Sequence, residues 1–161
     1  MMFVIRKATL ADANRISHLI VPLTQKYVCP TCDESVHPIL LDSMSGSNIK
    51  KYLSENYQYH VALNRDDGVV GVVGVRELTH LYHLFVSDHY QGQGLAKQLW
   101  EIAKSEAVSN GNKGRFTVNS ALNAEKVYLN FGFSRMNGIR NRGGMIDIPM
   151  VLDESHLTEV I

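Results

Sequence analysis

Hydrophobic and polar positions change period several times along the chain, which predicts an alternation of helices and strands. Between residues 16 and 23, apolar side chains recur at intervals of three and four, so this stretch should form a helix with one apolar face. Thr9 precedes it and Asp12 follows three positions later, an arrangement typical of a helix capping box. Because proline lacks an amide hydrogen, Pro22 is expected to kink or end this helix.

The middle of the chain carries short apolar runs that are typical of strands. Residues 59–63, 69–75 and 78–86 form three such runs, and Asp67-Gly68 between the first two is a hairpin signal. The run 69–75 is almost entirely valine and glycine, which predicts a strand buried on both faces. Strict alternation along the third run would give one face His80, Tyr82 and Leu84, and the other Leu81, His83 and Phe85.

The remaining elements continue this alternation of patterns. Residues 95–111 place apolar side chains at helical spacing, whereas residues 27–47, with two prolines, give no clear assignment. The other expected elements are strands at 3–6, 116–118, 133–136 and 145–151, and helices at 48–56 and 121–130. Without repeats or linkers, this order predicts one α/β domain with a mixed sheet.

Length, charge and composition exclude several classes of protein. The 161 residues suffice for one domain with its own core. Lysine plus arginine equal aspartate plus glutamate at 16 each, which argues against a nucleic-acid partner because such binders carry a basic excess. No apolar run is long enough to span a bilayer, and residues 1–7 are charged too early for a signal peptide. We therefore expect no membrane partner and a cytoplasmic location.

The two cysteines form a single Cys-x-x-Cys at Cys29 and Cys32. A structural zinc site needs four ligands, and a second cysteine pair is missing, although His37 lies close by in sequence. A thioredoxin-like redox motif is disfavoured because no strand leads directly into this segment. We expect ordinary thiols and no metal, while a metal or redox protein is kept as an alternative class.

The most informative segment is the loop between the strand 78–86 and the helix that begins at Leu95. The first amides of a helix lack internal partners, and they favour an anion together with the helix dipole. Gly92 and Gly94 allow the backbone to approach a diphosphate closely. The Walker ending Gly-Lys-Ser/Thr is absent, and the Rossmann spacing does not fit. A plain connecting turn is the alternative.

Gln91-x-x-Gly94-x-Ala96 resembles the Arg/Gln-x-x-Gly-x-Gly/Ala signature of the GNAT superfamily of acetyl-CoA-dependent N-acetyltransferases. Leu84-Phe85-Val86 resembles the family's fourth strand, and Tyr128-x-x-Phe131-Gly132-Phe133 resembles its Tyr-x-x-x-Gly-Phe element. The resemblance covers about residues 3–152. One departure is Asp88, where many relatives carry proline, and it should affect loop stiffness more than chemistry.

The resemblance implies a single GNAT-like domain over residues 1–154, followed by a C-terminal tail at 155–161. Its central sheet should be mixed, mostly antiparallel and splayed, with flanking helices. Acetyl-CoA would be the co-substrate, with its pantetheine arm between the fourth and fifth strands. The implied cofactor-binding residues are Leu84, Phe85, Val86, Gln91, Gly92, Gln93, Gly94, Leu95, Ala96, Lys97, Asn119 and Asn123. Helix capping is the alternative role for the two asparagines.

Acetyl transfer to an amine needs an acid and a base. By resemblance, Tyr128 protonates the departing sulfur, and an unperturbed tyrosine pKa of about 10 keeps it protonated at neutral pH. His80 stands where many relatives carry a glutamate base, and a structural histidine is the alternative there. Glu77 would replace it if a bulge shifted the register, or a water would act. The basic segment 138–144 either borders the acceptor site or is a solvated tip.

The leading hypothesis is an N-acetyltransferase that acts on a primary amine of a small molecule or a peptide. The alternative is a module that binds acyl-CoA as a sensor or partner, with little or no turnover. The presence of Tyr128 as a candidate acid favours the enzyme, whereas the lack of an obvious glutamate base keeps the sensor alternative open. The sequence is compatible with a homodimer and does not identify the acceptor.

Overall fold

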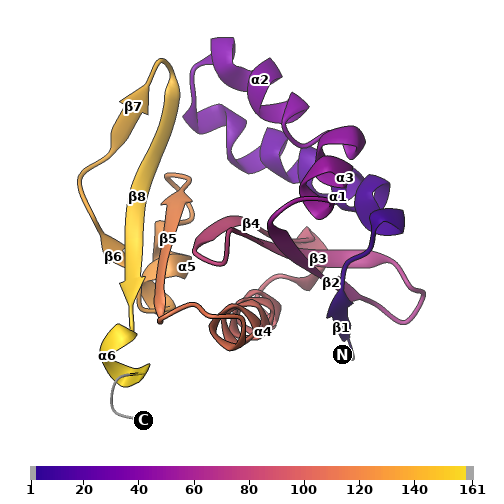
Figure 1. Ribbon diagram of the computed structural model, residues 1–161. Helices are drawn as coiled ribbons and strands as arrows, with labels where there is room; N and C mark the ends of the chain where they lie inside the picture. Colours follow the sequence, from indigo (N-terminus) through magenta and orange to yellow (C-terminus); the bar gives the residue numbers. More distant parts are fainter. Residues whose placement is uncertain (1–2, 159–161) are drawn as a thin grey trace.

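The computed structural model describes residues 3–158, which form an open, mostly antiparallel sheet flanked by helices (Figure 1). The strands follow the order β1-β2-β3-β4-β5-β8-β6, and β7 pairs with β8. The fold class expected from the resemblance is confirmed. The strands are β1 (Val4–Lys7), β2 (Tyr57–Leu63), β3 (Val69–Arg76), β4 (His80–Val86), β5 (Arg115–Ser120), β6 (Ser134–Arg135), β7 (Arg140–Arg142) and β8 (Met145–Asp153).

Helices cover both faces of the sheet, and each face has its own apolar cluster. The helix α4 packs below the sheet in Figure 1, with Leu99 and Trp100 fully buried. On the other face, Ile16 and Ile20 of α1 and Ile49 of α3 meet Val61 and Val72 of the sheet. The helices are α1 (Ala13–Tyr27), α2 (His37–Asp42), α3 (Gly46–Leu53), α4 (Leu95–Ser109), α5 (Glu125–Asn130) and α6 (Ser155–Thr158).

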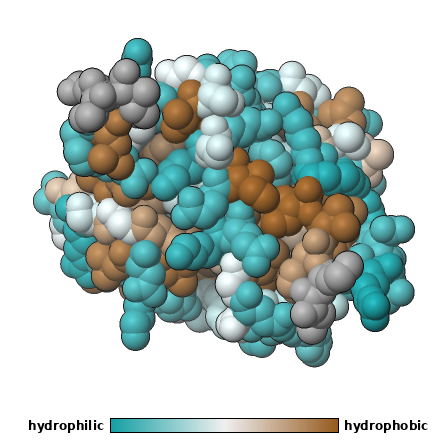
Figure 2. Space-filling view, turned by 90° about the horizontal axis from the view of Figure 1, so that it is seen from below, coloured by the Kyte–Doolittle hydropathy of each residue, from teal (hydrophilic) through white to brown (hydrophobic). Residues whose placement is uncertain are grey.

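The outer surface of the lower face mixes apolar and hydrophilic side chains (Figure 2). On α4, Ile102 and Val108 each keep 38% of their surface exposed. Isolated exposed apolar residues are normal on a monomeric surface, so these two give no reason to infer an interface.

The predicted capping box is present ahead of the first helix, but the helix does not end at Pro22. Thr9 and Asp12 form a capping box ahead of it, with the Thr9 amide donating to the Asp12 carboxylate at 2.8 Å. Pro22 lies inside α1, and the helix continues to Tyr27. Leu23 and Thr24 beyond the proline are buried, so their packing outweighs the lost backbone hydrogen bond.

The prediction of strict alternation along β4 is wrong because β4 carries a bulge. Gly74 of β3 pairs with His83 and Val75 pairs with Leu81, so Tyr82 has no partner on β3. Leu81 and Leu84 therefore both pack in the cluster between the sheet and α4. The rings of Tyr82, His83 and Phe85 lie together on the opposite face, where Tyr82 also contacts Tyr52 and Tyr57 of the upper cluster.

The sheet opens between β4 and β5, which run parallel. They pair only at His80 with Thr117 and at Leu81 with Val118. Beyond these two pairs the strands part, and β5 continues its pairing with β8 on its other side (Figure 1). The split lies next to the bulge, since a bulge bends and twists the strand that carries it.

Three regions differ from the sequence-based outline. Residues 27–47, left unassigned, contain two short 3₁₀ turns and α2. The strand β7 lies inside the segment expected to be a loop, and α5 begins at Glu125 rather than 121. Of the expected tail, Ser155–Thr158 is helical, and residues 159–161 lie outside the described residues.

Candidate functional site

The loop after β4 leaves the start of α4 open. Gly92 and Gly94 adopt left-handed conformations with φ of 76° and 79°. A Cβ built on either glycine would meet no atom within 4 Å. Gly94 is the N-cap, and no side chain caps the helix. The amides of the first turn of α4, from Leu95 to Lys97, are therefore not blocked by side chains of the described chain, which suits an anion-binding loop.

The Gln91 side chain forms hydrogen bonds within the loop that follows β4. Its side-chain amide donates to the Val86 carbonyl at 2.9 Å and approaches the Asp88 carboxylate at 3.3 Å. Asp88 also accepts from Lys26 at 2.7 Å, which lowers the pKa of this carboxyl group. The Tyr27 hydroxyl donates to the same carboxylate at 2.5 Å. Asp88 thus fastens the loop to the end of α1.

The two candidate asparagines lie at the end of β5 and before α5. Asn119 is exposed in β5, opposite Pro149 of β8. The Asn123 side-chain amide donates to the Tyr27 carbonyl at 2.7 Å. Neither asparagine caps α5, because the N-cap of that helix is Ala124 and no side chain bonds there. The capping alternative is therefore wrong for both.

Tyr128 lies on α5 with its ring in the cluster beneath the sheet, where it is 8% exposed. The rings of Phe131 and Phe133 meet it edge to face. Within residues 3–158 its hydroxyl has no hydrogen-bond partner, and it is not among the fully shielded polar atoms. Burial raises the pKa of Tyr128 to about 12, so the hydroxyl keeps its proton at neutral pH.

His80 lies where β4 and β5 begin to part. Its Nδ1 is 2.8 Å from Oγ1 of Thr117 on β5. Burial, followed by the nearby charges of Arg76 and Arg140, lowers the pKa of His80 to about 4. The imidazole is therefore neutral near pH 7 and able to accept a proton, although it is a weaker base than an unperturbed histidine.

Glu77, the other candidate base, lies in the tight turn between β3 and β4. Glu77 and Leu78 both have positive φ, 53° and 63°, and the Glu77 amide donates to the Asn56 carbonyl at 2.7 Å. Two successive non-glycine residues in this region are strained. The bulge that would admit Glu77 as a base exists in β4, but it lies at Tyr82, beyond His80 in the chain.

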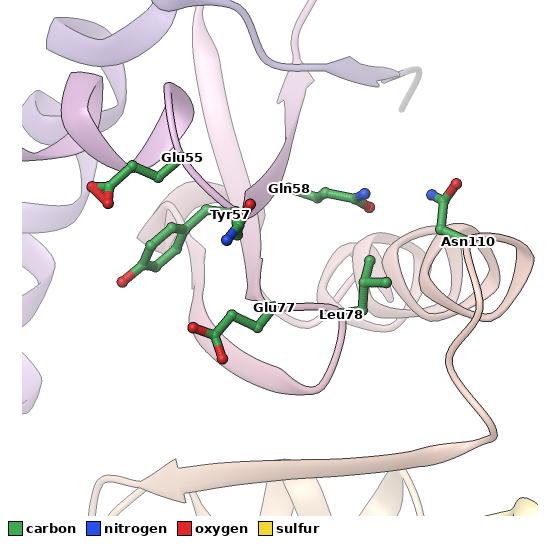
Figure 3. A pocket seen from close by; sticks show the side chains of 7 residues that line it. Glu55, Tyr57, Gln58, Glu77, Leu78 and Asn110 are labelled. Atoms are coloured by element: carbon green, nitrogen blue, oxygen red, sulfur yellow. The ribbon is translucent and has the colours of Figure 1, made fainter.

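A cavity of about 450 Å³ opens at this turn, lined by the loop before β2, the turn after β3 and the end of α4. Figure 3 shows the Glu55 and Glu77 carboxylates on the same side of the cavity as the Tyr57 hydroxyl, away from Gln58 and Asn110. Both carboxylates lack an ion-pair or hydrogen-bond partner within the part of the chain that the structure describes. The side of the cavity that carries Tyr57 is thus acidic.

Sequence reasoning missed an aromatic cluster that joins this cavity to the bulge. The Tyr57 ring stacks on Tyr52 and meets Tyr82 edge to face, at centroid distances of 4.7 and 5.4 Å. Deeper in, the Tyr59 hydroxyl lies 2.8 Å from Nδ1 of His83. Burial lowers the pKa of His83 to about 3, so this imidazole is neutral at physiological pH.

The cysteine segment packs against the β7–β8 hairpin. Cys29 is buried, and the Cys32 thiol donates to the Ile146 carbonyl at 3.7 Å. Nε2 of His37 donates to the Cys29 carbonyl at 2.6 Å rather than facing a sulfur. Among residues 3–158, no three His, Cys, Asp or Glu side chains gather as metal ligands. In the same range, no helix combines the length and apolarity that crossing a membrane requires.

The basic segment 138–144 is largely exposed, and one buried acid fixes its two arginines. Arg140 contacts Asp147 through two hydrogen bonds of 2.8 and 3.0 Å, and Arg142 adds a third of 3.0 Å. Asp147 is 6% exposed. Two guanidinium groups share one carboxylate, so the hairpin retains a positive charge.

Comparisons with known proteins point to one family. A family model described as acetyltransferase (GNAT) domain matches residues 30–154, more than half of the chain. Acetyltransferase Atu2258 of Agrobacterium fabrum (strain C58) is 25% identical over 112 residues, which cover 66% of this chain and 82% of that protein.

Solved structures share the fold at low identity. The PaiA N-acetyltransferase of Thermoplasma acidophilum, solved with coenzyme A, has a TM-score of 0.78 at 14% identity, over 94% of this chain and 98% of that one. A GCN5-related N-acetyltransferase of Rhodopseudomonas palustris has a TM-score of 0.75 at 16% identity, over 94% and 95% of the two chains. An aminoglycoside 6'-N-acetyltransferase, also with coenzyme A, has a TM-score of 0.67 at 13% identity, over 92% and 95%.

Proposed function

The chain belongs to the GNAT acetyltransferase family, and we propose that it moves the acetyl group of acetyl-CoA directly to a primary amine. The open start of α4 is the observation that carries this proposal. Unpaired amides and two left-handed glycines, with no side chain in the way, suit a diphosphate. When bound, acetyl-CoA supplies the activated acetyl thioester.

The residues that would hold acetyl-CoA lie along the split in the sheet. The amides from Gln91 to Lys97 would bind the pyrophosphate, although the Gln91 amide already donates to the Asp88 carbonyl. Leu84, Phe85 and Val86 would offer the free edge of β4 to the pantetheine arm, although the Val86 carbonyl already accepts from Gln91. Asn119 and Asn123, at the far side of the split, would supply polar contacts.

Proton transfer would involve groups on both sides of the split. Tyr128 is the proposed general acid, because its hydroxyl is protonated, unpartnered and not fully shielded. His80 is the proposed base, acting on the incoming ammonium directly or through water. Glu77 and water alone are the competing bases, and of these Glu77 lies in the turn before β4.

The acidic side of the cavity favours an acceptor that carries a positive charge. Glu55 and Glu77 place two carboxylates, neither ion-paired within the described residues, on the Tyr57 side of the cavity, while the Arg76 guanidinium lies over the neighbouring Tyr82 ring. Carboxylates and aromatic faces both attract ammonium groups. A protonated amine is therefore the acceptor that this surface supports best, in a small molecule or in a peptide.

A panel of amines, with detection of the released coenzyme A thiol, tests the activity. We expect thiol release with cationic amines and little with neutral or acidic ones. Binding of acetyl-CoA without thiol release for any amine would instead favour the sensor alternative.

Calorimetry of a glycine variant tests the binding loop. Gly94→Leu should weaken acetyl-CoA binding at least about tenfold, because the side chain would enter the space beside the amides. Gly111→Leu is the matched control, since Gly111 has positive φ and open space at the other end of α4. Equal affinities for the two variants would refute the loop assignment.

A further inference from the structure

We propose that Tyr27, the last residue of α1, is a positioning residue that ties together the two sides of the split between β4 and β5. It would hold the split at the width that the pantetheine arm requires. The inference rests on the proposed function, because it takes the split as the acetyl-CoA site. Tyr27 belongs to neither strand and to neither of the sequence motifs.

The Tyr27 side chain holds the β4 side. Its hydroxyl donates to Oδ1 of Asp88 at 2.5 Å, two residues after β4 ends. Lys26 reaches Oδ2 of the same carboxylate at 2.7 Å. Gln91 contacts Asp88 as well, so this attachment acts on the loop proposed to bind the pyrophosphate.

The Tyr27 backbone holds the β5 side. Its carbonyl accepts from the side-chain amide of Asn123 at 2.7 Å, three residues after β5 ends. One residue of α1 therefore bonds to both segments that follow the parted strands. The two contacts join positions 61 and 96 residues away in the chain.

Strand pairing does not set the width at this end of the split, and the His80–Thr117 side-chain contact lies at the other end. Ladder hydrogen bonds normally fix the spacing of neighbouring strands, and β4 and β5 pair at only two positions. Within residues 3–158, no hydrogen bond runs directly from the loop at 87–94 to the segment at 119–124. The bridge through Tyr27 thus replaces the missing ladder at the wide end of the split.

The bridge also explains how a carboxylate is tolerated beside an anion site. Asp88 would repel a pyrophosphate nearby, yet the Lys26 ammonium and the Tyr27 hydroxyl both engage it. The bridge therefore offsets that charge while it positions the loop.

Two variants cut the bridge at different ends. Tyr27→Phe removes the hydroxyl and keeps the ring, and Asn123→Ala removes the contact to the backbone on an exposed residue. Either should raise the Kd and the KM for acetyl-CoA about tenfold, as expected for a lost hydrogen bond to a charged or well-aligned partner. For Tyr27→Phe, kcat at saturating acetyl-CoA should stay within about twofold, because the bound arm then fills the split. Asn123→Ala also removes a proposed contact to acetyl-CoA, so its effect is read only against the double variant.

The double variant separates a bridge from two independent contacts. If both hydrogen bonds serve one connection, the double variant Tyr27→Phe with Asn123→Ala should bind acetyl-CoA with the same Kd as the weaker-binding single variant. Tyr52→Phe is the control, because its hydroxyl donates to the Ser43 carbonyl and accepts from Tyr82, neither of which joins the loop after β4 to the segment after β5, and Tyr52 is also half-buried. Its Kd for acetyl-CoA should match the wild type.

The outcomes distinguish this inference from the proposed function. Wild-type protein that does not bind acetyl-CoA overturns both. Wild-type protein that binds it, with unchanged Kd in Tyr27→Phe, overturns the Tyr27 bridge alone. Additive losses in the double variant also overturn it. Thermal melting of each variant identifies any that lose affinity through unfolding.

Discussion

Tyr128→Phe is the substitution that most sharply separates chemistry from packing in this protein. The hydroxyl makes no hydrogen bond within the described residues, so its removal leaves no partner unsatisfied. The free energy of unfolding should change by no more than about 0.5 kcal/mol, and Tm by less than about 2 °C. The ring contacts to Phe131 and Phe133 remain.

Turnover should respond very differently. Loss of a general acid lowers kcat by about 10²- to 10⁴-fold, which corresponds to about 3 to 5 kcal/mol of barrier. The Kd of acetyl-CoA should stay within about twofold, since Tyr128 is proposed to act on the sulfur rather than to bind the cofactor. Stopped-flow detection of released thiol, calorimetry and thermal melting measure the three quantities on the same preparation.

The pH profile adds an independent check. Burial raises the pKa of Tyr128 to about 12 by disfavouring the phenolate, so the acid form is lost only as pH rises through that value. Wild-type kcat should therefore show no alkaline decline from this group below about pH 11. Unchanged kcat in Tyr128→Phe would refute the acid assignment, and a large loss of Tm would show that the hydroxyl has a structural role instead.

Two further predictions concern His80 and Gly74. If His80 is the base, kcat/KM should decline on the acidic side near pH 4, because burial lowers the pKa of His80 and only protonation below that pKa removes the base. His80→Gln should abolish this acidic decline. A decline near pH 6.5 would contradict the assignment. A methyl group at Gly74 would overlap the buried Tyr59 ring, so Gly74→Ala should destabilise the fold by about 1 to 3 kcal/mol in a denaturant titration. Gly138→Ala, where no atom lies within 4 Å, should leave stability nearly unchanged, and equal stability of the two variants would show that the Tyr59 ring moves freely.

Most helices and strands could be predicted from the sequence, because their hydrophobic periods depend only on residues that are close together in the chain. The capping box at Thr9 and the valine-rich strand β3 are examples. The family and the fold class followed from short motifs around Gly94 and Phe133, and the comparisons confirm them.

The details of the candidate site were less accessible, because they depend on contacts between distant segments. The bulge at Tyr82 arises from the pairing of β4 with β3. The residues of β4 alone carry no pattern that would predict it. The aromatic cluster draws Tyr52, Tyr57 and Tyr82 from three elements. Continuation of α1 past Pro22 likewise reflects burial of its last turns.

The separation of β4 and β5 also bears on the tendency of the protein to aggregate. Strand edges without partners accept strands of other chains, and the free edges of β4 and β5 face each other across the split. A ligand present at about 100 times its Kd would add about 2.7 kcal/mol to stability while it covers these edges. If acetyl-CoA occupies the split as proposed, adding it should reduce aggregation of the purified protein.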